Sequence, residues 1–193
     1  MFGDGDTGPA GVPIRMPDIP SPFGGSAAEF DDAGAFVPEH LPDPGPFLDG
    51  CDVLTDERHV AFHGITQEVF EERTVYDMTF NYNLARLNRD TRHPNAGYRY
   101  AEESDTVLRA AFTPTTPFCP QTHTLTVGSF RAWNGLSERH GYDLVRVRAD
   151  PSHHESEAIN EMLTEMEETY RETGEIPEEA ESDVGRVPDE APF

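Results

Sequence analysis

Lysine is absent from this sequence of 193 residues, so that all 14 Lys/Arg positions are arginine, against 37 Asp and Glu. The formal net charge of −23 makes binding to nucleic acid or to an anionic membrane surface unfavourable, because phosphate contacts depend on cationic side chains. We therefore expect neither a nucleic-acid nor a membrane partner. The acidic excess runs along the whole chain and indicates a halophilic protein, since molar salt screens charges to about 3 Å.

Cysteine is nearly as scarce, with two residues, Cys51 and Cys119, and no CxxC pair or dense Cys/His array. This excludes a disulfide framework and fits a reducing compartment. The opening MFGDGDTGPAG has neither the basic nor the apolar segment of a signal peptide, and no apolar run approaches the ~18 residues of a membrane span. We expect a soluble, cytoplasmic protein.

Glycine, proline and acidic residues dominate both ends of the chain. Residues 1–50 predict a disordered acidic Gly/Pro-rich arm, and residues 175–193 predict a disordered acidic tail. Within the arm, a few hydrophobic residues either form a short docking segment or merely interrupt a linker: Phe30, Phe36, Val37 and Leu41. Residues 51–174 remain as a domain large enough to bury a core.

The pattern within 51–174 predicts a small α+β domain. We expect a short strand or helix entry at 60–65, a helix from 66 to about 87 that a break near Thr74 could interrupt, and strands at 98–101 and 106–113. A helix of about fifteen residues, a half-exposed strand around 144–148 and a helix that ends at Gly174 follow. For this last helix, Ser152 and Glu155 suggest a capping box. Its predicted apolar face consists of Ile159, Met162, Leu163, Met166 and Tyr170. The order α-β-β-α-β-α predicts two layers, with the helices on one face of a three-stranded sheet.

The stretch FTPTTPFCPQTH, residues 112–123, holds the most unusual cysteine. If Pro120 opens a helix, Cys119 is its N-cap, where unpaired N–H groups and the helix dipole favour the thiolate that binds soft metals. His123 follows one helical turn later and could share a metal with Cys119. The alternative is a cysteine that packs as a small hydrophobic residue and a histidine that simply lies on the surface.

A second candidate cluster is DPSHHESE, where His153 and His154 follow a strand and precede the last helix. Only one of two adjacent helical residues can readily face the site of Cys119, because they project about 100° apart. The alternative is that both histidines are exposed and have no function.

These two segments resemble the iron–sulfur assembly domain shared by the eukaryotic cytosolic iron–sulfur targeting proteins and bacterial SufT and PaaD. That family has a run close to FTPT-x-P-x-C, which is matched here by Phe112, Thr113, Pro114, Thr115, Pro117 and Cys119. Its eukaryotic members carry, after a later strand, a run close to GTH-x-SEE-x-x-N-x-x-L. Here PSHHESEAINEML supplies Ser152, His153, Glu157, Asn160 and Leu163. This sequence departs from the family with Phe118 where histidine is frequent, and with PQTHTLTVG after the cysteine.

The resemblance implies an accessory role in iron–sulfur cluster assembly or delivery through Cys119, not conventional enzyme catalysis. It implies a transient iron–sulfur cluster or iron, with Cys119 and His153 as cofactor-binding residues and metal ligands. His123 stays a further candidate metal ligand on its spacing from Cys119 alone. One thiolate cannot hold a cluster that takes about four, so the cluster would be shared between subunits of a homodimer or with a client. The partners would be other maturation factors and client apoproteins. Two alternatives stay open: an interaction module with a structural Cys119, and an enzyme in which Cys119 is the nucleophile and a histidine the base.

Overall fold

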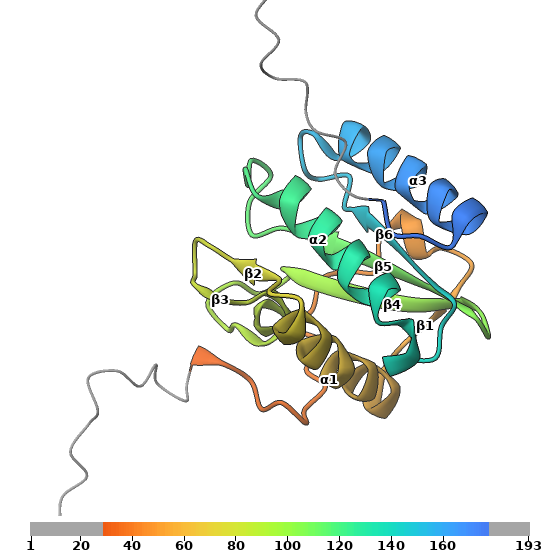
Figure 1. Cartoon of the computed structure of the whole chain (residues 1–193). Helices are drawn as coiled ribbons and strands as arrows, with labels where there is room; N and C mark the ends of the chain where they lie inside the picture. Colours follow the sequence, from red (N-terminus) through yellow and green to blue (C-terminus); the bar gives the residue numbers. More distant parts are fainter. Residues whose placement is uncertain (1–28, 178–193) are drawn as a thin grey trace, which may run out of the picture.

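A four-stranded mixed sheet organises the fold of the computed structural model, which describes residues 29–177 (Figure 1). Its strands lie in the order β1 (Asp52–Val53), β4 (Gly97–Ser104), β5 (Val107–Thr113) and β6 (Leu144–Ala149). β4 runs antiparallel to β1 and β5, whereas β5 and β6 are parallel. The predicted α+β class is confirmed, but the sheet has four strands rather than three, because the short β1 pairs with one end of β4.

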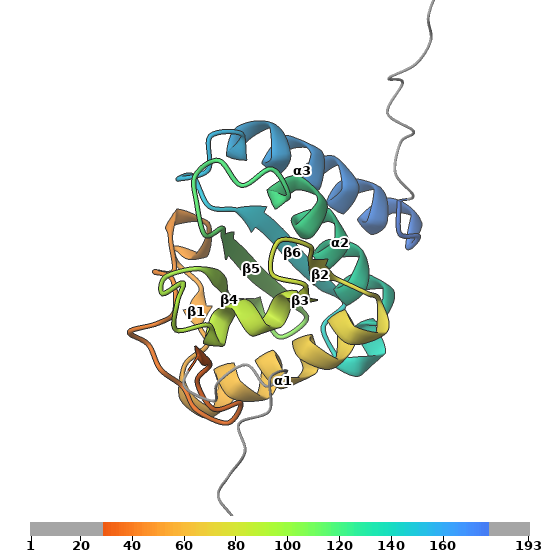
Figure 2. The same cartoon turned by 90° about the vertical axis from the view of Figure 1, so that its left-hand side faces the viewer.

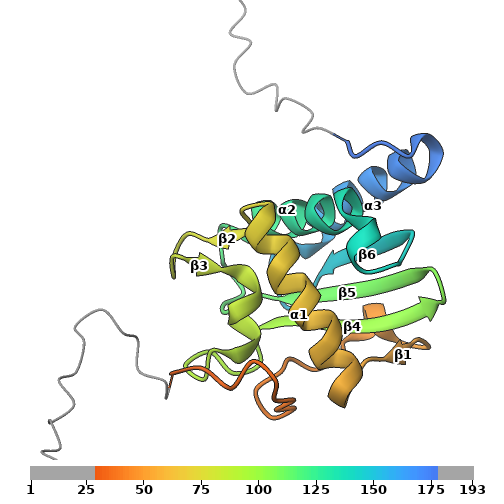
Figure 3. The ribbon, with the colours of Figure 1, turned by 60° about the horizontal axis from the view of Figure 1, so that its bottom comes forward.

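Helices α1 (Asp56–Glu72) and α2 (Thr122–Gly135) cover one face of the sheet, and α3 (Ser156–Thr173) lies along its β6 edge. α1 and α2 lie side by side over the sheet, and α3 packs against α2 and β6 (Figures 2 and 3). Alternate strand residues point into this layer and meet the apolar helix faces. The largest fully buried side chains include Phe70, Tyr98, Tyr100, Leu108, Phe112, Phe130, Trp133 and Leu163.

The first predicted helix is wrong in its extent. α1 ends at Glu72, and Thr74 takes a positive φ of 58°, a conformation that β-branched residues rarely adopt. The chain then forms a two-stranded hairpin, β2 (Tyr76–Asp77) and β3 (Tyr82–Asn83), followed by the 3₁₀ helix η3 (Leu84–Arg89). Val75, Met78, Tyr82, Ala85 and Leu87 had suggested one helical face. Val75, Tyr82, Ala85 and Leu87 are buried through this hairpin and η3 instead, whereas Met78 is exposed, so its predicted place on a buried face is wrong.

The last helix starts later than the capping box predicted. α3 begins at Ser156, its N-cap is Glu155, and no side chain caps its first turn. Its end is as expected, because Gly174 adopts the left-handed conformation with φ 71°. The predicted apolar face is confirmed: Ile159, Leu163 and Met166 are buried, and Met162 and Tyr170 pack partly buried against the core.

The predicted disordered arm is wrong for residues 29–50, which fold against the domain. Leu41 and Leu48 are buried, and Phe30 forms a β-bridge with Asp90. Leu48 belongs to the 3₁₀ turn η2 (Pro46–Leu48), which lies on the sheet face opposite the helices (Figure 2). The parts of the predicted arm and tail at 1–28 and 178–193 lie outside the described residues.

β6 is more buried than its alternation of Arg and Val predicted. Arg109, Arg146 and Arg148 lie beside one another on the outer sheet face, with their guanidinium carbons 5.2–5.8 Å from the ring centre of Phe47. The buried carboxylate of Glu167, from α3, pairs with Arg146 and Arg148. The turn η2 and helix α3 thus exclude solvent from a face that the sequence suggested was open.

Among residues 29–177, no helix is both long and apolar enough to cross a membrane.

Candidate functional site

The β5–α2–β6 unit brings the two sequence motifs together. β5 and β6 are parallel, so the loops that follow them leave the sheet at the same end. The loop after β5 carries Cys119, and the loop after β6 carries His153 and His154. Asn134 of α2 fixes this unit, since its side chain exchanges hydrogen bonds of 2.9 and 2.8 Å with the main chain of Val145.

Cys119 lies in the loop and not at the helix N-cap. α2 begins at Thr122 with Gln121 as its N-cap, so the predicted capping position is wrong by two residues. The prolines of this segment did not open the helix; they form a turn in which the N–H of Cys119 donates to the carbonyl of Thr116 at 3.3 Å. Cys119 is a free, half-buried cysteine that belongs to a loop and not to the hydrophobic core.

His153 is the residue that contacts the cysteine loop most directly. Its Nε2 donates a hydrogen bond of 3.0 Å to the main-chain oxygen of Cys119. A carbonyl can only accept, so Nε2 carries the proton, and Nδ1 is left to accept from the N–H of Glu155 at 3.3 Å. With 2 % of its surface exposed, His153 is buried and both ring nitrogens are engaged. In this geometry the imidazole holds the loop, and its predicted ligand role stays a prediction.

His154 reinforces the same loop. Both its main-chain N–H and its Nδ1 donate to the carbonyl of Pro117, at 3.0 and 2.9 Å. Its ring centre lies 5.2 Å from that of Phe118. Sequence reasoning left His154 without a role, because nothing in the sequence shows that an exposed histidine reaches a carbonyl in another loop.

His123 projects from the first turn of α2. Its Nε2 lies 3.1 Å from the Sδ of Met162 on α3. Within residues 29–177, no histidine makes a hydrogen bond to the thiol of Cys119. The role predicted for His123 as a ligand stays a prediction.

Asn160, another residue of the second motif, anchors α3 to the end of β6. Its Oδ1 accepts from the N–H of Ala149 at 2.7 Å, and its Nδ2 donates to the carbonyl of the same residue at 2.9 Å. These two bonds fix where α3 starts relative to the loop that carries His153. The motif residues therefore act together as a brace for the Cys119 loop.

Two exposed apolar side chains flank this loop. Met78 and Phe118 are the exposed large hydrophobic residues of the described part of the chain, at 73 % and 72 % exposure. Phe118 precedes Cys119, and the N–H of Met78 donates to the side chain of Gln121 at 3.0 Å. Isolated exposed apolar residues are ordinary, but two beside one accessible thiol form a surface suited to protein contact. The sequence placed Met78 on the apolar face of a helix, because only the hairpin fold carries it to this end and exposes it.

The chain was compared with protein families, curated proteins and solved structures. Residues 28–177 match the family model "Domain of unknown function (DUF7998)", which covers more than half of the chain. The chain belongs to this family. The match includes the folded arm from residue 29 onward, in agreement with its burial in the structure. Neither the curated proteins nor the solved structures gave a match.

The other cysteine of this DUF7998 domain lies far from the site. Cys51 is free and packs partly buried against Leu48, Ala101 and Ala111 on the outer sheet face. It precedes β1, which pairs with the Ala101 end of β4, whereas Cys119 follows the end of β5 that pairs with Gly97. The two cysteines are therefore at opposite ends of the sheet. Across residues 29–177, no group of three or more His, Cys, Asp and Glu side chains is placed to hold a metal ion.

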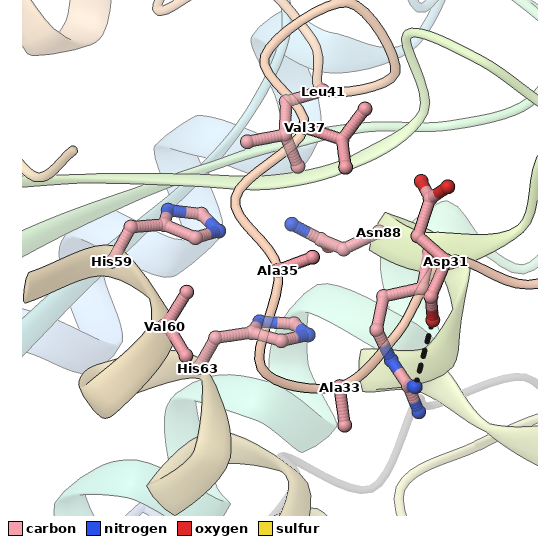
Figure 4. Close-up of a pocket in the computed structure, with 10 residues that line it drawn as sticks. Asp31, Ala33, Ala35, Val37, Leu41, His59, Val60, His63 and Asn88 are labelled. Carbon is pink, nitrogen blue, oxygen red and sulfur yellow. Dashed lines mark hydrogen bonds between the residues drawn. The ribbon is translucent and has the colours of Figure 1, made fainter. Parts of the chain in front are cut away.

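A small cavity of about 10 Å³ lies under the folded arm of the DUF7998 domain, beside α1 and η3 (Figure 4). Such a volume holds about one water molecule. His59 and His63 line it with stacked rings 5.6 Å apart. Burial lowers the pKa of His59 to about 3 and that of His63 to about 4, so both are neutral. His63 is fully bonded, since its Nε2 donates to the carbonyl of Ala85 and its Nδ1 accepts from the hydroxyl of Tyr100, both at 2.9 Å.

Proposed function

We propose that this domain is an accessory factor, an adaptor or carrier, in the assembly of iron–sulfur clusters or their delivery to client proteins, acting through Cys119. The observation that carries the proposal is half-buried Cys119 on a braced loop. It directly follows exposed Phe118 and lies two residues before Gln121, whose side chain accepts from the N–H of exposed Met78. A thiol that must meet a partner's cluster has to be accessible, and its surroundings have to bind protein. A half-buried cysteine beside exposed apolar residues at this end of the sheet supports the proposal on both points.

The resemblance to the iron–sulfur assembly domain is supported by the positions of its two motifs. They lie far apart in the sequence, yet His153 of the second donates its hydrogen bond to Cys119 of the first. The family order of elements, in which the cysteine follows a strand and precedes a helix, also fits β5, the loop and α2.

In this proposal the cluster is cargo. Cys119 would supply one thiolate, and a second copy or the client would supply the remaining ligands, because clusters take about four. His153 would position the loop, since both its nitrogens already make hydrogen bonds. The proposal places the protein in a reducing cytoplasm, together with other maturation factors and client apoproteins.

The test is anaerobic reconstitution with iron and sulfide. We expect thiolate-to-iron absorption in the wild type and in Cys51→Ser, and its loss in Cys119→Ser. Cys51→Ser is the matched control because it removes a thiol at the opposite end of the sheet. Equal absorption in all three proteins would remove Cys119 from the ligand set.

A second candidate is an interaction module in which Cys119 is structural. The exposure of Phe118 and Met78 favours it, because apolar contact alone could recruit a partner. In that case Phe118→Ser would abolish partner capture while Cys119→Ser would leave it intact. The nucleophile alternative gains no support, since within residues 29–177 no imidazole bonds the thiol of Cys119.

A further inference from the structure

A polar pocket of about 370 Å³ lies between α1, the β2–β3 hairpin and η3. Its volume falls within the range of small-molecule sites. Most of its wall consists of side chains that carry N–H or O–H groups. The lining residues are Gln67, Glu71, Tyr76, Asn81, Tyr82, Asn83, Arg86 and Arg89.

Arg86 is the least expected member of this wall. The chain has 37 acidic residues for 14 arginines, so a carboxylate partner is easy to provide. Seven arginines of the described residues form such ion pairs: Arg58, Arg92, Arg109, Arg139, Arg146, Arg148 and Arg171. Arg86 has no hydrogen bond or ion pair within residues 29–177.

Aromatic rings hold Arg86 in place without using its hydrogen-bond donors. Its guanidinium carbon lies 4.4 Å from the ring centre of Phe30 and 5.7 Å from that of Tyr82. Such contacts orient a guanidinium by its flat face and leave its N–H edge free. Arg86 is therefore positioned for a planar acceptor that is not part of the domain.

Arg89 lines the same pocket and is only partly satisfied. One terminal nitrogen donates to the carbonyl of Asp31 at 3.1 Å, and the other lies 3.4 Å from the side-chain oxygen of Gln67. Its Nε is buried with no hydrogen-bond partner. The side-chain N–H groups of half-buried Gln67 and exposed Asn81 also make no hydrogen bond to an acceptor within residues 29–177. The donors that this wall leaves without acceptors suit a ligand rich in oxygen.

Glu71, the one carboxylate of the wall, is bonded to two other residues of the same wall. Its two oxygens accept from the hydroxyl of Tyr76 at 2.7 Å and from Nδ2 of Asn83 at 3.1 Å. These bonds lower the pKa of Glu71 and keep it charged. An anionic ligand would thus lie on the η3 side of the pocket, against Arg86 and Arg89.

We propose that this pocket binds a small oxyanion, a phosphate or carboxylate group, between Arg86 and Arg89. The fork of a guanidinium matches the paired oxygens of either group. The site is separate from the proposed role of Cys119 and stands without it.

The test is isothermal titration calorimetry of the full chain in 1 M KCl, with potassium phosphate in one arm and potassium malonate in the other. We expect saturable heat with at least one of them, and binding at least tenfold weaker in Arg86→Gln. The matched control is Arg58→Gln, which removes the same charge from an arginine paired with Asp52 and Glu102 outside the pocket. It should bind like the wild type.

If only phosphate binds, the natural ligand carries a phosphate group. If only malonate binds, it carries a carboxylate. Binding of both anions shows that the pocket recognises the oxyanion chemistry that the two groups share. If Arg86→Gln does not fold, Asn81→Asp places a negative charge at the exposed hairpin turn and should weaken binding likewise. No saturable heat with either anion, or equal losses in Arg86→Gln and Arg58→Gln, would overturn the proposal.

Discussion

The imidazole of His153 donates a hydrogen bond of 3.0 Å to the main-chain oxygen of Cys119, thirty-four positions earlier in the chain. This bond joins the loop after β6 to the loop after β5. It is the direct physical link between the two motifs on which the functional proposal depends.

Replacing His153 with alanine should release the cysteine loop. Two hydrogen bonds and a buried ring are lost, for which we expect a cost of about 1–3 kcal/mol in unfolding free energy. Local opening should also expose the thiol, so that Cys119 is alkylated faster in a Cys51→Ser background. His123→Ala, which removes an exposed ring in contact with Met162, is the control and should leave the alkylation rate unchanged. Equal rates in all three proteins would contradict the bracing role.

Among substitutions of buried residues, Glu167→Gln should be one of the most destabilising. The carboxylate is 2 % exposed and pairs with Arg146, Arg148 and Arg171. Its neutralisation leaves the buried guanidinium of Arg148 without its counter-charge, while Arg146 keeps its pair with Glu103, and we expect a cost of about 3–5 kcal/mol. Thermal unfolding measures this as a fall of roughly 10 °C in Tm. Glu168→Gln, the exposed neighbour on α3, changes the same charge and should move Tm by less than about 2 °C.

Stability should fall as pH drops below about 6.5. His59 and His63 have folded-state pKa values near 3 and 4, lowered by burial and further by Arg99 and Arg89 respectively, whereas in the unfolded chain they titrate near 6.5. Between these values the unfolded state binds more protons, so each histidine removes about 1.4 kcal/mol per pH unit as pH decreases. Above pH 7 this contribution is complete.

Denaturant unfolding from pH 8 to pH 4.5 measures this slope. His63→Gln should show a shallower dependence than the wild type, because one buried imidazole no longer resists protonation. The same slope in both proteins would show that other groups control the acid response.

Salt should stabilise the domain. With a net charge of −23, the compact chain repels itself, and added salt screens that repulsion. We expect Tm to rise steadily between 0.2 and 2 M KCl. A Tm that is flat or falls over this range would contradict the halophilic interpretation of the composition.

Strong periodicity predicted the elements that the structure confirms. The alternation in β6 and the apolar face from Ile159 to Tyr170 could be predicted because each follows from the local geometry of a strand or a helix. The hairpin after α1 was missed because Val75, Tyr82 and Leu87 are equally compatible with a helical face, and the left-handed Thr74 is stabilised only by the tertiary fold. A short edge strand such as β1 has too few residues to form a pattern.

The candidate site was likewise predictable from the sequence only in part. Cys119 and His153 were found because motif residues and strand order are visible in sequence. The hydrogen bond that makes His153 a brace, and the arrival of Met78 beside the loop, depend on the parallel pairing of β5 with β6 and on the hairpin. The pocket at Arg86 has no sequence signal, because an unpaired arginine can be recognised only when its neighbours are known.

The most direct test of the central claim is the iron and acid-labile sulfide retained per chain after anaerobic reconstitution and gel filtration. The account predicts retention by the wild type and by Cys51→Ser, and none above background by Cys119→Ser. Retention by Cys119→Ser at the wild-type level would contradict a role for Cys119 in holding a cluster.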